Sequence, residues 1–362
     1  PILPGEIPNT DSGTGMIMGL LAEQADRLKR GPVEAAGAGQ TLAPGEVAVR
    51  ANFATIEHRE GKFLITDRRA GRITKGTHEL AEALTNVDLG DGVTGRFLPT
   101  DQHRGVIILS GQGLHDAISD TDPGDLNMPA AMKICQPLEP EAELTAVKVN
   151  RFIIEAHQLL ADHPVNVTRV RDGKLPASGL ITRGAGSRFE LDNTLINQGL
   201  KVALVSGCNT VLGLGSIFGF EVIRDERFTA DTDTDLDAKF WAVRKALNKN
   251  DLVYVHIKAP DICSHDRQPL AKRDFLQRID LSLKPLLESG ATIAVAADHT
   301  TDSNTGSHSA DPVPALIYQP GAGRRAEPVK FGETSCSEGN MGRQLSKEFL
   351  SQVVTTMKSA AV

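Results

Sequence analysis

The chain has 362 residues, with 46 acidic and 39 basic side chains and a formal net charge of -7. Its hydrophobic content of 40% excludes an intrinsically disordered chain, and no apolar run reaches the ~18 residues that a membrane span needs. The acidic balance argues against nucleic acid as a partner, because such binding requires a clustered basic face. Four scattered cysteines in no metal-binding pair and no visible signal peptide predict a reducing cytoplasm.

The N-terminal region reads as a loop that leads into a helix. The chain begins at Pro1 rather than Met, and residues 1–12 contain three prolines and no regular apolar spacing. Apolar residues then recur at helical spacing over Gly15–Lys29, which predicts one helix. Three polar residues in front of it are candidate N-terminal caps: Thr10, Asp11 and Ser12.

The next part of the chain has the pattern of a separate domain. Short apolar segments divided by turns predict strands at Val47–Ile56, Lys62–Thr66 and Val106–Ser110. A predicted helix, Glu143–Leu160, closes this stretch.

From Leu180 onward, strands alternate with helices. The predicted strands are Lys201–Val205, Leu252–Ile257 and Thr292–Ala296, and the predicted helices are Phe240–Leu247 and Leu270–Leu287. Such alternation predicts a mostly parallel sheet flanked by helices. In sheets of this kind, ligands bind at the carboxyl ends of the strands.

Carboxylate and imidazole side chains follow two of these predicted strands. Asp261 and His265 come after LVYVHIK, Asp298 and His299 come after the next strand, and His308 lies in the loop beyond. These ligand types suit Zn²⁺ or Mn²⁺, and five of them exceed what one ion requires. The pattern therefore predicts two divalent metal ions and no organic cofactor. The alternative is that each histidine has an unrelated capping or surface role.

A series of short motifs runs along nearly the whole chain. KAPD with His265, ADHTT and HSADPVP carry the metal-type residues, and GPVEAAGAG, RANFATI, DRRAGR, HRGVIIL, ISDTDP, HPVN and RGAG occur elsewhere. In this order the motifs resemble those of the archaeal-type cofactor-independent phosphoglycerate mutases of the alkaline phosphatase superfamily. The resemblance implies an alkaline-phosphatase-like α/β core, residues 1–39 and 173–362. It also implies an inserted α+β substrate-binding lid, residues 40–172.

The resemblance also implies roles for single residues. The segment PNTD, residues 8–11, matches the nucleophile motif of the family, so we expect the Thr10 hydroxyl to attack phosphorus after a metal lowers its pKa. The family pattern makes Asp261, His265 and His308 ligands of one ion, and Asp298 and His299, with Thr10, ligands of the other. The alternative is that Thr10 only caps the following helix.

Arginines in the same motifs are candidates for binding the substrate. Their planar guanidinium groups suit phosphate and carboxylate oxygens. Three lie in DRRAGR and three in other motifs: Arg68, Arg69, Arg72, Arg50, Arg104 and Arg183. A solvated surface loop is the alternative interpretation of DRRAGR.

Three departures from the family leave the substrate open. The Asp-Gly strand of the family, whose Asp completes the second metal site, does not precede Pro1. We expect either a truncated or processed chain, with a separate N-terminal segment, or a second ion bound with one carboxylate fewer. Leu212 stands where the family mutases carry Lys. The loop after KAPD reads SHDR in place of GHDG, and Gly124 replaces the histidine of a DTDPH-type motif. Metal positions are thus kept while substrate positions differ.

The leading prediction is phosphoryl transfer through Thr10, with interconversion of 2- and 3-phosphoglycerate as in glycolysis. The alternatives are a phosphomonoesterase or phosphonate-metabolite enzyme of the same superfamily, a non-catalytic homologue, and an acid/base catalyst that uses Pro1. In each enzyme reading the partner is a small phosphorylated or phosphonate substrate, with neither nucleic acid nor membrane. A homo-oligomer is left open.

Overall fold

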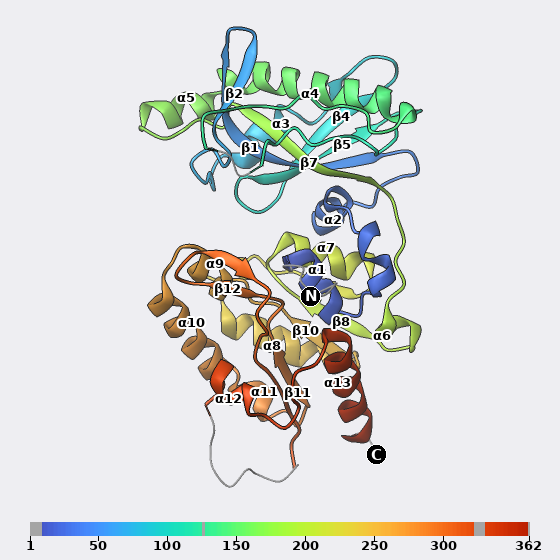
Figure 1. The fold of residues 1–362 in the computed structure, drawn as a ribbon, viewed down its shortest axis with the longest axis vertical. Helices are drawn as coiled ribbons and strands as arrows, with labels where there is room; N and C mark the ends of the chain where they lie inside the picture. The colour runs from blue at the N-terminus through green and yellow to red at the C-terminus, as the bar shows by residue number, and fades with distance from the viewer. Residues whose placement is uncertain (1–8, 125–126, 322–329, 361–362) are drawn as a thin grey trace. The chain divides into compact units, whose positions relative to one another are not determined.

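The structure is a computed structural model that describes residues 9–124, 127–321 and 330–360 (Figure 1). Residues 1–8, which include Pro1 and most of the predicted N-terminal loop, lie outside the described residues. The chain divides into two compact units. Unit 1 comprises Pro1–Leu28 and Leu191–Val362, and unit 2 comprises Lys29–Glu190. Unit 2 is therefore inserted into the sequence of unit 1.

A seven-stranded antiparallel sheet forms the centre of unit 2. Its order is β3 (Val87–Asp88), β4 (Thr94–Pro99), β5 (Arg104–Ser110), β1 (Val47–Arg59), β2 (Lys62–Asp67) and β6 (Ala130–Ala131), and β7 (Gly179–Ser187) also pairs with β1. Its helical segments are α2 (Arg30–Gly37), α3 (Thr77–Glu82), η2 (Pro140–Ala142), α4 (Glu143–Ala161) and α5 (Pro164–Arg171). The predicted strands correspond to β1, β2 and β5, and the predicted helix to α4.

Side chains of β1 alternate between the two faces of this sheet. Val49 and Phe53 lie in a buried cluster with Phe152 of α4. The opposite face carries Ala48, which packs with Ala35 of α2. Since α2 and β7 both pack on β1, unit 2 extends beyond residues 40–172 at each end.

Unit 1 contains a three-stranded parallel sheet in the order β10 (Leu252–Val255), β8 (Val202–Val205) and β9 (Glu221–Ile223). Two antiparallel pairs follow in sequence: β11 (Ile293–Ala296) with β14 (Ala315–Tyr318), and β12 (Thr300–Asp302) with β13 (Ser307–Ser309). The strand predicted at Thr292–Ala296 thus forms, but it pairs antiparallel, because the chain returns along β11 after the β12–β13 hairpin. The helices of unit 1 include α6 (Thr194–Asn197), α7 (Asn209–Ile217), α8 (Leu236–Ala246), α9 (Ala259–His265), α12 (Glu333–Ser337) and α13 (Ser346–Ala360).

Two helices predicted as continuous are interrupted. The prediction of one helix over Gly15–Lys29 is wrong: α1 spans Thr10–Ile17, and a 3-10 segment, η1, spans Ala22–Arg27. Between them Gly19 has a φ of 95°, a conformation that glycine adopts at little cost. The helix predicted over Leu270–Leu287 forms as two helices, α10 (Pro269–Ser282) and α11 (Lys284–Leu287). Pro285 interrupts it because proline cannot donate the next helical hydrogen bond.

Among the described residues, no helix is both long enough and apolar enough to cross a bilayer.

A close contact between α2 and β1 gives a test of the packing in unit 2. A Cβ atom on Gly31 would lie 2.0 Å from the backbone oxygen of Ala48. We therefore expect Gly31→Ala to lower the free energy of unfolding by about 2 kcal/mol or more, as overpacking against backbone does. A Cβ on Gly332 would meet nothing within 4 Å, so Gly332→Ala is the control. Equal denaturant midpoints for the two variants would contradict this packing.

Candidate metal centre and arginine cluster

Helix α9 carries the first two predicted ligands. It begins shortly after β10 ends, so Asp261 lies in its first turn and His265 one turn later on the same face. His265 Nε2 lies 3.5 Å from Asp261 Oδ2. The two ligands predicted after this parallel strand therefore lie together on one short helix.

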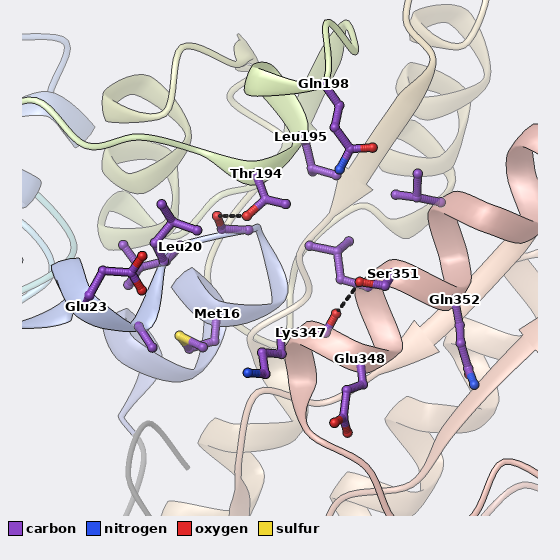
Figure 2. Close-up of a pocket in the computed structure, with 15 residues that line it drawn as sticks. Met16, Leu20, Glu23, Thr194, Leu195, Gln198, Lys347, Glu348, Ser351 and Gln352 are labelled. Carbon is purple, nitrogen blue, oxygen red and sulfur yellow. Dashed lines mark hydrogen bonds between the residues drawn. The ribbon is translucent and has the colours of Figure 1, made fainter.

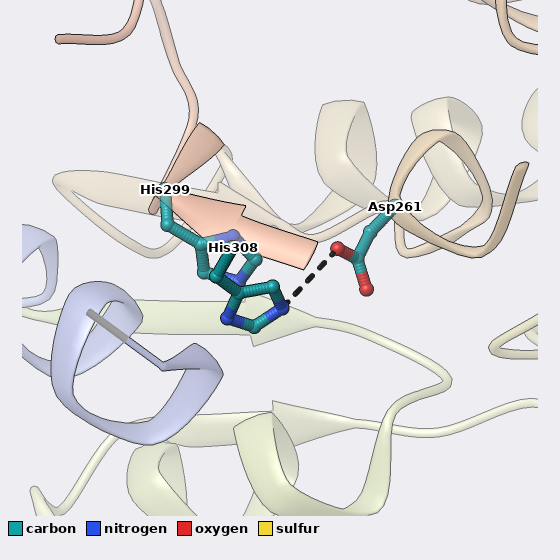
Figure 3. A group of neighbouring side chains, drawn as sticks. All are labelled: Asp261, His299 and His308. Atoms are coloured by element: carbon teal, nitrogen blue, oxygen red, sulfur yellow. Dashed lines mark ion pairs between the residues drawn. The ribbon is translucent and has the colours of Figure 1, made fainter. Parts of the chain in front are cut away.

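The β12–β13 hairpin brings in His308. Its register places His308 directly opposite Thr301. His308 Nε2 lies 3.9 Å from Asp261 Oδ1 and 3.2 Å from His265 Nε2. The ring of His299 stacks on the ring of His308 with centroids 3.9 Å apart. Donor atoms of Asp261, His299 and His308 all lie within 4.8 Å of one another, and they could hold a metal ion (Figure 3).

Asp298 connects this cluster to α1. Its Oδ2 lies 3.4 Å from His299 Nε2 and accepts a hydrogen bond of 3.1 Å from the Thr14 hydroxyl on α1. The C-terminal end of α1 is held by Tyr254 of β10, whose hydroxyl donates to the Ile17 carbonyl at 2.9 Å. The middle and the C-terminal end of this helix are thus held by the loop that carries Asp298 and by strand β10.

Two of the histidines, His265 and His299, have the hydrogen bonds that metal ligands usually have. Nδ1 of His265 lies 2.7 Å from the Gly306 carbonyl, and Nδ1 of His299 lies 3.2 Å from the Thr301 hydroxyl. A partner at Nδ1 leaves the lone pair of Nε2 for a metal. His299 Nε2 is buried and makes no hydrogen bond within the described part of the chain. An orphaned imidazole nitrogen beside two carboxylates fits a divalent cation.

Asp261 is kept ionised at this centre. Burial raises the pKa of a carboxyl group, but the Lys258 ammonium and the Thr301 hydroxyl act in the opposite direction and hold the pKa of Asp261 well below its usual range. Thr301 Oγ1 donates to Asp261 Oδ1 at 2.6 Å, and Lys258 Nζ lies 2.6 Å from Asp261 Oδ2. The carboxylate is therefore charged in the form that binds a metal.

Thr10 is the first residue of α1. The alternative that it caps this helix is wrong, because the N-cap is Asn9, whose backbone N–H donates to Ser12 Oγ at 3.0 Å. Thr10 Oγ1 instead accepts a hydrogen bond of 2.9 Å from Lys258 Nζ. Through Lys258, the hydroxyl is linked to Asp261.

Three residues at this centre were missed by the reasoning from sequence: Lys258, Thr301 and Thr14. Lys258 begins KAPD and Thr301 ends ADHTT, so both stood in recognised motifs without an assigned role. A hydroxyl two residues after His299 on a strand was the available signal for Thr301. Thr14 carried none, since its contact depends on how α1 packs.

The predicted arginines gather in unit 2. Arg50 of β1 pairs with Arg183 of β7, and Asn52 of β1 pairs with Arg104 of β5. Residues paired across strands share a face, as do residues two apart on one strand. Arg50 is 8% exposed, and burial, opposed by Glu34 and reinforced by neighbouring arginines, lowers its pKa to about 9.

The DRRAGR loop joins the same group. Burial lowers the pKa of Arg69, and Arg72, Arg104 and Arg68 lower it further. Arg68 is also paired with Asp122 at 2.6 Å. The six predicted arginines therefore form one neighbourhood of positive charge, which we call the arginine cluster.

Four buried polar atoms in the arginine cluster or on residues beside it have no hydrogen bond within the described residues: Nε of Arg50, Nε of Arg183, Oδ1 of Asn52 and Nδ1 of His103. His103 is 4% exposed, and burial followed by the charges of Arg104 and Arg69 lowers its pKa to about 3. The two guanidinium Nε–H groups are buried donors that carry positive charge, and such donors are suited to an anion. His103 and Asn52 were not predicted as site residues.

A hollow of about 580 Å³ lies elsewhere in unit 1, between α1, η1, α6 and α13 (Figure 2). Its walls are mainly apolar, with Met16, Leu20 and Leu195 among them. Two of its polar side chains are satisfied locally, since Thr194 donates to the Gly19 carbonyl and Ser351 to the Lys347 carbonyl. None of the predicted metal ligands lines it, so it is separate from the metal centre.

The two units together define a mixed α/β protein with a group of potential metal ligands and an arginine cluster. Residues 1–166 match a family model described as 2,3-bisphosphoglycerate-independent phosphoglycerate mutase. A protein of that name from Methanopyrus kandleri is 37% identical over 95% of this chain and 82% of its own length. Another from Methanoculleus marisnigri is 38% identical over 94% of this chain and 82% of its own.

Solved structures are similar over the same extent. A cofactor-independent phosphoglycerate mutase from Thermoplasma acidophilum has a TM-score of 0.62 and 29% identity, covering 97% of this chain and 87% of that chain. A protein from Pyrococcus horikoshii has a TM-score of 0.77 and 25% identity, covering 99% and 85%. The chain belongs to the family of 2,3-bisphosphoglycerate-independent phosphoglycerate mutases, which are isomerases.

The hydrogen bonds of Thr301 predict a role in holding the metal ligands. Thr301→Val removes a hydroxyl that contacts Asp261 and His299 with little change of shape. Loss of such a supporting bond costs about 10–100-fold in metal affinity, and we expect this loss in a titration with Mn²⁺. Thr301→Ser keeps the hydroxyl and is the control. Equal Mn²⁺ affinity of the Val and Ser variants would show that the Thr301 hydroxyl does not support the metal ligands.

The buried His103 predicts a pH dependence of stability. Its pKa is about 3 in the folded protein, against an ordinary 6.5, so between these values only the unfolded chain takes up the proton. The free energy of unfolding should therefore fall as the pH is lowered through this range. His103→Gln should make the fall between pH 7 and 5 smaller, by up to about 2 kcal/mol.

Denaturant unfolding at the two pH values measures this difference. His78 is exposed, so His78→Gln should leave the fall unchanged. If His103→Gln also left it unchanged, His103 would not be held neutral by its surroundings.

Proposed function

We propose that the chain interconverts 2- and 3-phosphoglycerate and that Thr10 is the nucleophile. The observation that carries this proposal is the position of the Thr10 hydroxyl. It lies 2.9 Å from Lys258 Nζ, which in turn lies 2.6 Å from the Asp261 carboxylate, at the centre of the potential metal ligands. The reaction is inferred from membership of the mutase family. The role of Thr10 as the nucleophile is inferred from the position of its hydroxyl.

Two divalent ions are part of the proposal, with Mn²⁺ or Zn²⁺ suited to the ligand types. Asp261, His265 and His308 would hold one ion, and Asp298 and His299, with Thr10, would hold the other. When bound, such ions lower the pKa of a coordinated hydroxyl and neutralise phosphoryl oxygens. The division itself follows the family pattern, and the stacking of His299 on His308 supports only that the two sets of ligands lie side by side.

The proposed reaction has two transfers that mirror each other. In the first, a bond forms between Thr10 Oγ1 and phosphorus while the bond from phosphorus to the C3 oxygen of glycerate breaks. The hydroxyl loses one proton and the glycerate oxygen gains one, so charge is balanced. In the second, the C2 oxygen of the same glycerate attacks phosphorus and Thr10 is released with its proton. Thr10 thus carries the phosphoryl group between the two positions.

The arginine cluster would bind the anionic substrate. Arg50, Arg69 and Arg183 bring positive charge to buried or partly buried positions. Four nearby carboxylates offset only part of this charge: Glu34, Asp67, Asp120 and Asp122. A small phosphorylated carboxylic acid offers two anionic groups that would satisfy the orphaned guanidinium donors. Unit 2 would in this way act as the substrate-binding lid of the predicted architecture.

The remaining predictions fit the same proposal. The parallel strands of unit 1, with ligands following β10, favour an alkaline-phosphatase-like core. All four cysteines are free, as is usual in a reducing cytoplasm. A homo-oligomer stays a prediction.

Phosphorus NMR of the Mn²⁺-loaded protein with 3-phosphoglycerate tests the reaction. We expect 2-phosphoglycerate to appear, and Thr10→Ala should lower the rate by at least about 10³-fold, the scale on which loss of a nucleophile acts. Thr10→Ser keeps a hydroxyl and should retain measurable turnover. Circular dichroism checks that both variants are folded.

Release of inorganic phosphate in place of 2-phosphoglycerate would favour a phosphomonoesterase. Undiminished turnover by Thr10→Ala would exclude Thr10 as the nucleophile.

A further inference from the structure

We propose that Lys258 is a catalytic residue whose ammonium group binds the phosphoryl oxygens while phosphorus is bonded to Thr10. This inference rests on the proposed function, because it takes Thr10 as the group that receives the phosphoryl. It assigns a role to a residue that is neither a predicted metal ligand nor a member of the arginine cluster.

The position of Lys258 is fixed by its place in the chain. It is the N-cap residue of α9, in the short connection between β10 and this helix. Its side chain is 19% exposed. Nζ donates to Thr10 Oγ1 at 2.9 Å and lies 2.6 Å from Asp261 Oδ2. The ammonium therefore stands between the proposed nucleophile and a proposed metal ligand.

Geometry gives this ammonium access to the transferred group. A phosphoryl group on Thr10 places its outer oxygens one bond beyond phosphorus, around the same Oγ1 that Lys258 already contacts. An ammonium has three N–H donors and can turn on a flexible stem, so it can exchange the hydroxyl for one of these oxygens without backbone movement. Lysine is well suited to this task because it acts as a compact point charge on phosphate.

The surrounding charges favour the same role. If Asp261 binds a divalent ion, its negative charge is shared with that ion, and Lys258 then faces a second cation as well as the carboxylate. An anionic group at Thr10 restores an attractive partner for the ammonium. The other buried ammonium nearby, Lys239, is already held by the carbonyls of Thr229 and His256.

The opposing interpretation is that Lys258 serves only as a counter-ion of Asp261. It predicts that Lys258 is dispensable for anion binding once metal is present. Orthovanadate, which resembles a phosphoryl group in transfer, distinguishes the two interpretations because its binding needs no turnover.

The test is calorimetric titration of the Mn²⁺-loaded full chain with orthovanadate. Lys258→Met should weaken vanadate binding by about 10–100-fold, the scale of a hydrogen bond to a charged group, and Lys258→Arg should recover part of it. Lys249 also pairs with a carboxylate, that of Glu221, but on the surface, so Lys249→Met is the matched control and should bind vanadate like the wild type. A parallel Mn²⁺ titration should show that every variant still binds the metal.

Three results would overturn the inference: wild-type protein that binds no vanadate, Lys258→Met with unchanged vanadate affinity, or Lys258→Met that no longer binds Mn²⁺. The proposed function fails separately. If vanadate binding depends on Lys258 but 3-phosphoglycerate yields no 2-phosphoglycerate, the inference holds and the mutase proposal does not.

Discussion

One partly buried carboxylate, that of Asp261, sets the arrangement of the potential metal ligands in unit 1. A carboxylate in this position has to be compensated, because its charge is costly away from water. Compensation comes from separate segments of the chain: Lys258 at the start of α9, Thr301 on β12, and the imidazoles of His265 and His308. The β12–β13 hairpin and helix α9 must therefore meet at one point. That requirement also places α1, since Lys258 reaches Thr10 from the same point.

Unit 2 has the opposite problem, an excess of positive charge on one face of a sheet. Arg50 and Arg183 are direct neighbours across β1 and β7, where like charges destabilise the sheet. Glu34, 3.7 Å from Arg50, relieves only part of the repulsion. Local rules of stability are commonly broken at functional sites, and an anionic substrate would supply the missing compensation. In the proposed function, unit 1 would bind the cations and unit 2 would bind the anion.

Much of this arrangement could be predicted from short-range patterns. Strand β10 follows from its apolar run, and the four-residue spacing of Asp261 and His265 places them on one face of a helix. The arginines were identified by motif, but their pairing was not, because Arg50 and Arg183 meet through strands far apart in sequence. The grouping of His299 with His308 likewise depends on the register of a hairpin. Helix interruptions at Gly19 and Pro285 were available as local signals and were outweighed by the apolar periodicity.

Anomalous X-ray diffraction at the manganese edge, from crystals of the full chain soaked in Mn²⁺, would locate the proposed two-ion centre around Asp261 and Thr10. We expect two peaks, one bound by Asp261, His265 and His308 and the other by Asp298, His299 and Thr10. A single peak, or peaks away from these residues in well-ordered crystals, would contradict it.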